Sequence, residues 1–120
     1  MLVPIRFGRL KPLFVVLGMT PSRCYLELLP ETVRVRMSWG FRADIARASI
    51  QGARRVPDAP HSIGVHGWRG HWIVNGAAGP LVELTLARPV PARAVGVRIG
   101  LKRLAVSVDD PERLAAELTR

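Results

Sequence analysis

The chain has 120 residues, of which 48% are hydrophobic and 22% charged, a composition that excludes disorder and fits one folded domain. The net charge of +9 favours contact with nucleic acid, anionic lipid or an acidic protein face. The single cysteine, Cys24, excludes an intrachain disulfide, and the longest apolar run, residues 12–19, is too short to span a membrane.

The basic composition has two readings. Arginine supplies sixteen of the eighteen basic residues, and no window holds a long run of like charges. Such a composition can follow from genomic bias, with the charges scattered over the surface, or it can form one basic face. The lone cysteine and the lack of a cleavage site after the apolar run predict a cytoplasmic protein, with peripheral attachment at the inner membrane surface as the alternative.

Residues 1–22 form an apolar and basic N-terminal extension. The run from Leu13 to Leu17 is too uniformly apolar for alternation to indicate a buried face. The extension could add a strand, cover a sheet edge or pair with a second copy. Because an apolar segment should not stay in water, we expect it to be structural.

The clearest strand covers residues 32–39, where apolar and polar side chains alternate strictly. Residues 24–29 form its partner in a hairpin that turns at Pro30, which suits the second position of a turn. Residues 41–50 fit a strand better than a helical turn. In the 32–39 strand, the pattern places Val33, Val35, Met37 and Trp39 inward and Arg34 and Arg36 outward.

Turn signals divide the second half of the chain into further short strands. Residues 56–61 read as a loop, and residues 67–72 as a tight reversal. The Asn75-Gly76 pair is typical of a hairpin turn. Strands are then expected at residues 81–86, 95–99 and 104–108. A helix is predicted at residues 110–119, because Asp110 can cap it and Pro111 suits its first position.

These elements predict a mainly β domain over residues 23–120. The expected architecture is an open barrel or two orthogonal antiparallel sheets of about seven strands. The C-terminal helix carries an apolar stripe of Leu114, Ala115 and Leu118, and this stripe should pack over one open end of the core.

Four segments carry a resemblance to a known family. They read VRVRMSWGFRADI, GVHGWRGHWIVNG, GPLVELTL and LAVSVDDPERLAAEL. They resemble a bacterial pleckstrin-homology-like domain and are similar to actinobacterial proteins of about this length, from Arg23 to Leu118. The resemblance implies the barrel with its terminal helix and a role in binding phosphoinositides, phosphopeptides or proteins. Phosphoinositide binders of that type carry a basic motif between the first two strands, and residues 29–31 hold no basic residue, so the family's headgroup site is not expected.

The candidate binding residues are basic or lie at a hairpin. Arg34 and Arg36 share one strand face, and Arg42 extends the stripe across the turn. Trp68 and Arg69 could form a second contact patch, unless Trp68 packs on its own hairpin while Trp39 and Trp72 fill the core. Four further arginines would widen the basic stripe if they fell beside it: Arg54, Arg55, Arg98 and Arg103.

No catalytic, metal or cofactor site is predicted. His61, His66 and His71 have no carboxylate or thiol in the same segment to complete a ligand set. Cys24 lies on an alternating strand, where a buried small side chain is expected rather than a nucleophile. We therefore expect a non-enzymatic module that presents the basic face and the Trp68 hairpin to a partner protein. Electrostatic binding to anionic lipid or nucleic acid is the alternative, followed by a small-ligand carrier or enzyme.

Overall fold

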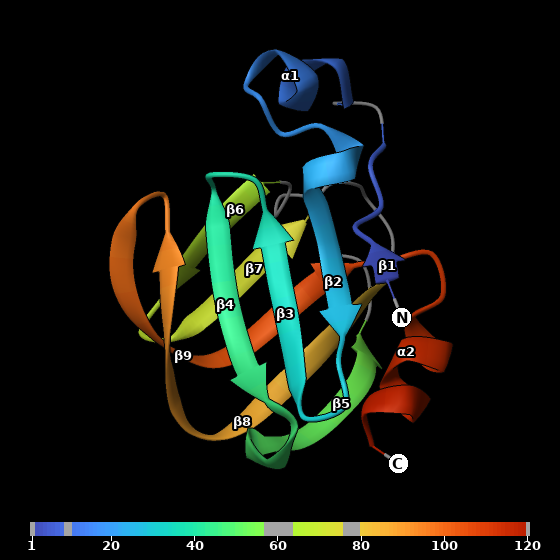
Figure 1. Ribbon diagram of the computed structural model, residues 1–120, viewed down its shortest axis with the longest axis vertical. Helices are drawn as coiled ribbons and strands as arrows, with labels where there is room; N and C mark the ends of the chain where they lie inside the picture. The colour runs from blue at the N-terminus through green and yellow to red at the C-terminus, as the bar shows by residue number, and fades with distance from the viewer. Residues whose placement is uncertain (1, 9–10, 57–63, 76–79, 120) are drawn as a thin grey trace.

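The computed structural model describes residues 2–8, 11–56, 64–75 and 80–119 (Figure 1). Its strands are β1 (Leu2–Pro4), β2 (Cys24–Leu28), β3 (Thr32–Met37), β4 (Phe41–Ala46), β5 (Ile50–Val56), β6 (Gly64–Trp68), β7 (His71–Asn75), β8 (Leu81–Ala94) and β9 (Val97–Ser107). Its α-helices are α1 (Lys11–Val16) and α2 (Pro111–Leu118), and short 3-10 helices lie at η1 (Pro21–Arg23) and η2 (Arg47–Ser49).

The strands form one curled sheet, so the mainly β class with a C-terminal helix is confirmed. The order across the sheet is β1-β2-β3-β4-β8-β9-β7-β6, and β5 pairs with β8 beside this path. All pairs are antiparallel except β7 with β9, which run parallel. Figure 1 shows the sheet wrapping around the core, with α2 at its lower right.

Two long strands, β8 and β9, give the sheet its curl. Their register shifts between Thr85 and Val90, which divides the ribbon into two halves. The proximal half joins residues 81–85 to residues 103–107 and pairs with β5, whereas the distal half joins residues 90–94 to residues 97–101 and pairs with β4. The separate strands expected at 95–99 and 104–108 are therefore one strand, because β9 continues through the bend.

The prediction that the strands on either side of Asn75-Gly76 pair as a hairpin is wrong. Strand β7 lies between β6 and β9 and does not pair with β8. The preceding reversal is confirmed, since Arg69 and Gly70 both have positive φ, 52° and 84°, and join β6 to β7. Residues 57–61 of the expected loop and residues 76–79 lie outside the described part of the chain.

The hairpin of β2 and β3 is confirmed and supplies much of the core. Leu29 N–H donates to the Thr32 carbonyl at 2.9 Å, which closes its turn. Val33, Val35 and Met37 are fully buried. The inward position of Trp39 is wrong, because 52% of its surface is exposed. Strand β3 ends at Met37, and the positive φ of Ser38, 49°, takes the chain out of the alternation.

The N-terminal extension adds an edge strand, one of the three arrangements considered for it. Strand β1 pairs with β2, and Arg6 N–H donates to the Ser107 carbonyl at 2.9 Å. Helix α1 buries Phe14, but it leaves Val16 83% exposed and Leu13 53% exposed. The prediction that the side chains of the apolar run are buried is therefore wrong for most of α1.

Helix α2 forms as its cap residues predict. The Asp110 carboxylate accepts from Arg113 N–H at 3.2 Å, and Pro111 takes the first helical position. Leu114, Ala115 and Leu118 are buried against the sheet, where α2 packs on β5 and β8. None of the helices in the described ranges has the length and apolarity needed to cross a membrane.

Candidate functional site

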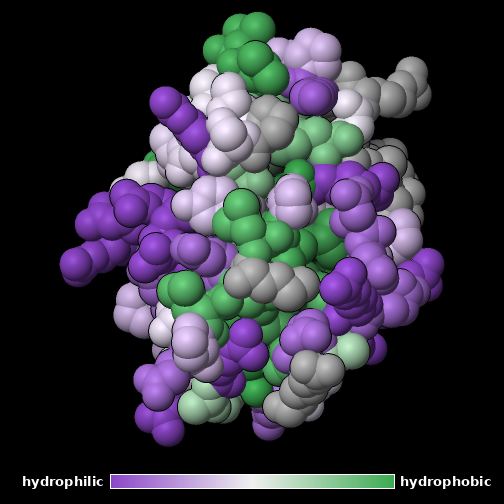
Figure 2. Space-filling model, turned by 45° about the vertical axis from the view of Figure 1, so that its right-hand side comes forward, coloured by the Kyte–Doolittle hydropathy of each residue, from purple (hydrophilic) through white to green (hydrophobic). Residues whose placement is uncertain are grey.

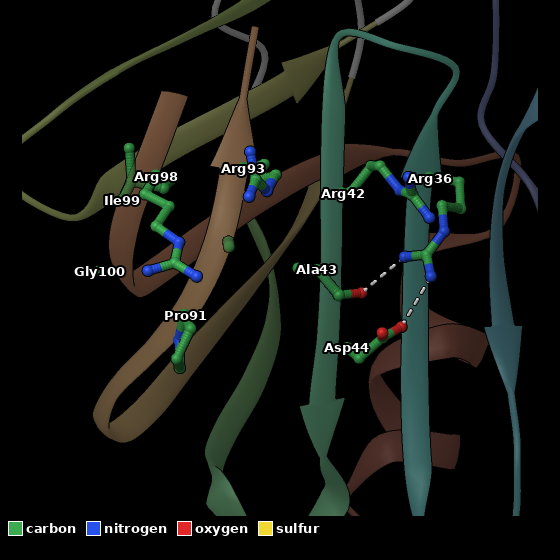
Figure 3. Close-up of a pocket in the computed structure, with 10 residues that line it drawn as sticks. Arg36, Arg42, Ala43, Asp44, Pro91, Arg93, Arg98, Ile99 and Gly100 are labelled. Carbon is green, nitrogen blue, oxygen red and sulfur yellow. Dashed lines mark hydrogen bonds and ion pairs between the residues drawn. The ribbon is translucent and has the colours of Figure 1, made fainter. Parts of the chain in front are cut away.

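Four arginines face one another across four neighbouring strands. The register pairs Arg36 of β3 with Arg42 of β4, Arg42 with Arg93 of β8, and Arg93 with Arg98 of β9. Because directly opposite residues share one face of a sheet, all four side chains leave the same face. We call these four residues the arginine row. In Figure 3 the side chains of Arg36 and Arg42 lie over β3 and β4, and those of Arg93 and Arg98 lie over the distal half of the β8–β9 ribbon.

A cavity of about 660 Å³ lies on the arginine row. Its volume is within the range of roughly 300 to 1,000 Å³ that is usual for small-ligand sites. Among the described residues, Asp44 is the one carboxylate in its lining. The other lining residues are the four arginines of the row with Ala43, Pro91, Ala92, Ile99 and Gly100.

Arg36 is held in place by protein groups. Its guanidinium donates to the Ala43 carbonyl at 3.2 Å and to the Asp44 carboxylate at 3.0 Å (Figure 3). It also donates to the Val35 carbonyl at 2.9 Å. Arg34 Nε also lies 3.4 Å from the same Asp44 oxygen. The charge of Asp44 is therefore already shared by two arginines of β3.

The other three arginines of the row have no such neutralising partner. Of the carboxylates in the described ranges, none lies within 4.0 Å of Arg42, Arg93 or Arg98. Like charges directly opposite on neighbouring strands destabilise a sheet. A bound anion would remove that repulsion, and the planar guanidinium fork matches phosphate and carboxylate oxygens.

A second cavity, of about 340 Å³, continues the basic surface beyond β3. It shares Arg36 and Arg42 with the first cavity and adds Arg23. Tyr25 lies opposite Arg36 in the register, so the row ends in an aromatic side chain. The remaining lining residues are Ser22, Ser38 and Trp39.

The structure brings together some of the residues proposed from the sequence. Arg34, Arg36 and Arg42 share one face, although Arg34 pairs with Glu27 and Asp44 and lines neither cavity. Arg69 lies in the β6–β7 turn and also lines neither cavity. The side chain of Trp68 is outside the described part of the structure.

Arg98 is the one further arginine that falls beside the basic stripe. Arg54 and Arg103 instead approach Glu83, at 3.3 and 4.0 Å, and Arg55 pairs with Glu112 at 3.0 Å. These three ion pairs lie away from the arginine row, around the proximal half of the ribbon.

Sequence reasoning missed Arg93 because it missed a turn. Val95 and Gly96 have φ values of 50° and 79°, the combination of a tight two-residue hairpin turn. A turn centred on these two residues pairs Arg93 with Arg98 automatically. Gly96 could have indicated this turn, but the valine before it argued against one, because valine is unusual at the first central position of such a turn.

Of the nucleophile and metal candidates, Cys24 lies in the described part of the chain, whereas the three-histidine candidate does so only in part. Cys24 is fully buried, as expected, and burial raises the pKa of its thiol to about 11, so it stays protonated and unreactive near neutral pH. In the portions that the structure describes, no three His, Cys, Asp or Glu side chains gather as metal ligands. His61 and the side chain of His66 fall outside those portions.

The resemblance to pleckstrin-homology-like domains stays a prediction. Comparison of the chain with protein-family models, with curated proteins and with solved structures finds no match.

Proposed function

We propose that this protein is a non-enzymatic binding module whose arginine row holds a phosphate-bearing anion. The observation that carries the proposal is the direct cross-strand succession of Arg42, Arg93 and Arg98 without a carboxylate partner among the described residues. Scattered surface charge would not place three like charges in neighbouring register positions, where they repel one another.

The preference for phosphate follows from charge and geometry. A phosphate group can carry more than one negative charge and offers several acceptor oxygens, so it can bridge two guanidinium groups at once. Arg36, fixed by Asp44 and two carbonyls, supplies a rigid end to the row. The flanking Trp68–Arg69 hairpin, favoured from the sequence as a protein contact, is not needed for this binding.

The test is a calorimetric titration with tripolyphosphate at low salt. Arg42→Gln and Arg98→Gln should each weaken binding about tenfold, because each removes a charge-assisted hydrogen bond. Arg54→Gln is the matched control: it removes one positive charge from an arginine that pairs with Glu83, and it should change the affinity less than about twofold.

Two results would overturn the proposal. One is the absence of tripolyphosphate binding to the wild-type protein at low salt. The other is an equal loss of affinity in Arg54→Gln and Arg42→Gln, which would assign binding to net charge alone. Thermal unfolding of each variant shows whether it is folded under the titration conditions.

A further inference from the structure

Apolar side chains are exposed at one end of the molecule. Val16 of α1 is 83% exposed, Trp39 of the β3–β4 turn 52% and Val95 of the β8–β9 turn 55%. Figure 2 shows the apolar side chains over α1 at the top of the molecule, with no polar cover on that view. Clustered exposed apolar residues mark contact sites, since they are costly to leave in water.

Hydrogen bonds join the three segments that carry these residues. Trp39 Nε1 donates to the Leu17 carbonyl at 2.7 Å, which joins the end of α1 to the β3–β4 turn. Val95 N–H donates to the Gly40 carbonyl at 2.8 Å, which joins that turn to the β8–β9 turn. Figure 1 shows α1, the β3–β4 turn and the β8–β9 turn in the upper part of the molecule. We define the apolar ridge as Val16, Leu17, Trp39, Val95 and Val97.

The backbone of Val95 points to a role for its side chain. Its φ of 50° lies in the left-handed region, which a β-branched residue adopts only with strain. Asparagine or glycine would fit this turn position without that strain. Because the Val95 side chain is exposed rather than packed in the core, folding does not explain its presence.

The arginine row lies directly behind the apolar ridge. Arg93 is two residues before Val95 of the β8–β9 turn, and Arg42 is three residues after Trp39 of the β3–β4 turn. Because an extended chain spans at most about 3.3–3.6 Å per residue, the backbone of the row lies within roughly 10 Å of the ridge. An interfacial element buries its apolar side chains by about 5–10 Å, so inserted ridge residues would leave the arginines at the depth of lipid headgroups.

We propose that the apolar ridge inserts into an anionic membrane surface, and that the phosphates bound by the arginine row are those of phospholipid headgroups. This inference rests on the proposed function and names the source of its anion. A soluble phosphate would leave the ridge in water. A second copy could cover the ridge, but it would bring two arginine rows of like charge toward each other.

Tryptophan at the centre of the apolar ridge fits this occupant. Its ring is amphipathic and favours the boundary between headgroups and acyl chains. Arg23 lines the second cavity together with Trp39 and adds a positive charge there. Charge and apolarity therefore meet at one edge of the molecule, as binding to an anionic lipid surface requires.

The first experiment is co-sedimentation with vesicles of phosphatidylcholine alone or mixed with phosphatidylglycerol. The wild-type protein should bind the mixed vesicles and bind pure phosphatidylcholine weakly. Val16→Asp should lower the partition coefficient about tenfold, since a charge replaces an inserted side chain. Arg42→Gln should lower it about fivefold on mixed vesicles only.

Val95→Asn separates membrane insertion from a structural role. It should raise the thermal midpoint, because asparagine relieves the strain at φ 50°, and yet lower vesicle binding about fivefold. Its affinity for tripolyphosphate should equal that of the wild-type protein. Vesicle binding unchanged in both Val95→Asn and Val16→Asp would overturn the inference.

Two further outcomes also decide it. Tripolyphosphate binding without any vesicle binding would leave the proposed function standing and overturn membrane insertion. A wild-type dimer that Val16→Asp converts to a monomer would assign the ridge to self-association instead. Dibrominated acyl chains should quench the wild-type fluorescence more than that of Trp39→Phe, and equal quenching would place Trp39 outside the lipid.

Discussion

The two halves of the β8–β9 ribbon carry arginines in opposite settings. Around the proximal half, Glu83 lies within 4.0 Å of both Arg54 and Arg103, so basic and acidic groups offset each other. In the distal half, Arg93 and Arg98 face each other and Arg42 without a carboxylate of the described ranges within that distance. Arg98 and Arg103 lie on the same strand, β9, yet Arg103 has a carboxylate within 4.0 Å on one side of the bend and Arg98, on the other side, has none among the described residues.

Their packing differs in the same direction. The proximal half buries large side chains such as Leu84 and Leu104, both fully inaccessible. The distal half buries the small side chains Ala92 and Ala94 of β8 and one large side chain, Leu101 of β9, and it ends in the exposed Val95. The proximal half therefore contributes more large buried side chains to the core than the distal half does.

The largest expected difference between the two halves is in the free energy of unfolding lost when a side chain is truncated. Leu104→Ala should lower the free energy of unfolding by about 2–5 kcal/mol, as large-to-small changes in a closed core do. Ile99→Ala, in the distal half, should cost about 1 kcal/mol because Ile99 is only partly buried. Urea unfolding measures both. Equal losses would show that the two halves contribute alike to stability.

Removal of the one carboxylate that lines the larger cavity should sharpen the contrast in charge. Asp44→Asn takes a negative charge from beside the arginine row and should tighten tripolyphosphate binding about fourfold at low salt, which is the effect of one charge at about 5 Å in water. Calorimetry at low and high salt measures the change. Glu83→Gln is the control, and a matching gain there would contradict the distinction between the halves.

The smallest expected effect is on the free energy of unfolding, which two arginine substitutions should change in opposite directions. Arg98→Gln should raise the free energy of unfolding by about 0.5 kcal/mol, since it removes a repulsion with Arg93. Arg103→Gln should lower it by a similar amount, about 0.5 kcal/mol, since Glu83 loses a partner. Both changes should shrink as salt is added. Chemical denaturation at low salt is the measurement, and the same sign for both would break the comparison.

Local patterns predicted the elements of this fold well, but not their long-range pairing. Alternation gave β3 and its buried face, and the Asp110-Pro111 signal gave α2. The parallel pairing of β7 with β9 could not be predicted, because the residues of a strand do not specify a partner 32 positions away. The bend within β8 and β9 was hidden for the same reason.

Two of the four residues of the arginine row could be predicted from strand alternation in the sequence. Arg36 and Arg42 follow from strand alternation and a short turn. Arg93 required a turn that places valine at positive φ, against its ordinary preference. Trp39 was assigned to the core because alternation was continued through Ser38, where the backbone had already left the strand. Both errors occur at turns that the proposed membrane contact would use.

The contact between Arg6 and Ser107 has a consequence for the way the chain folds. Arg6 N–H donates to the Ser107 carbonyl at 2.9 Å, and the Ser107 hydroxyl donates to the Arg6 carbonyl at 3.0 Å. Contacts between residues so distant in sequence slow folding, because a large loop must close before they form. Strand β1 can pair with β2 early, because the two are close in sequence. The bonds between Arg6 and Ser107 form only once the end of β9 has been synthesised, so we expect them to be among the last contacts of the native sheet.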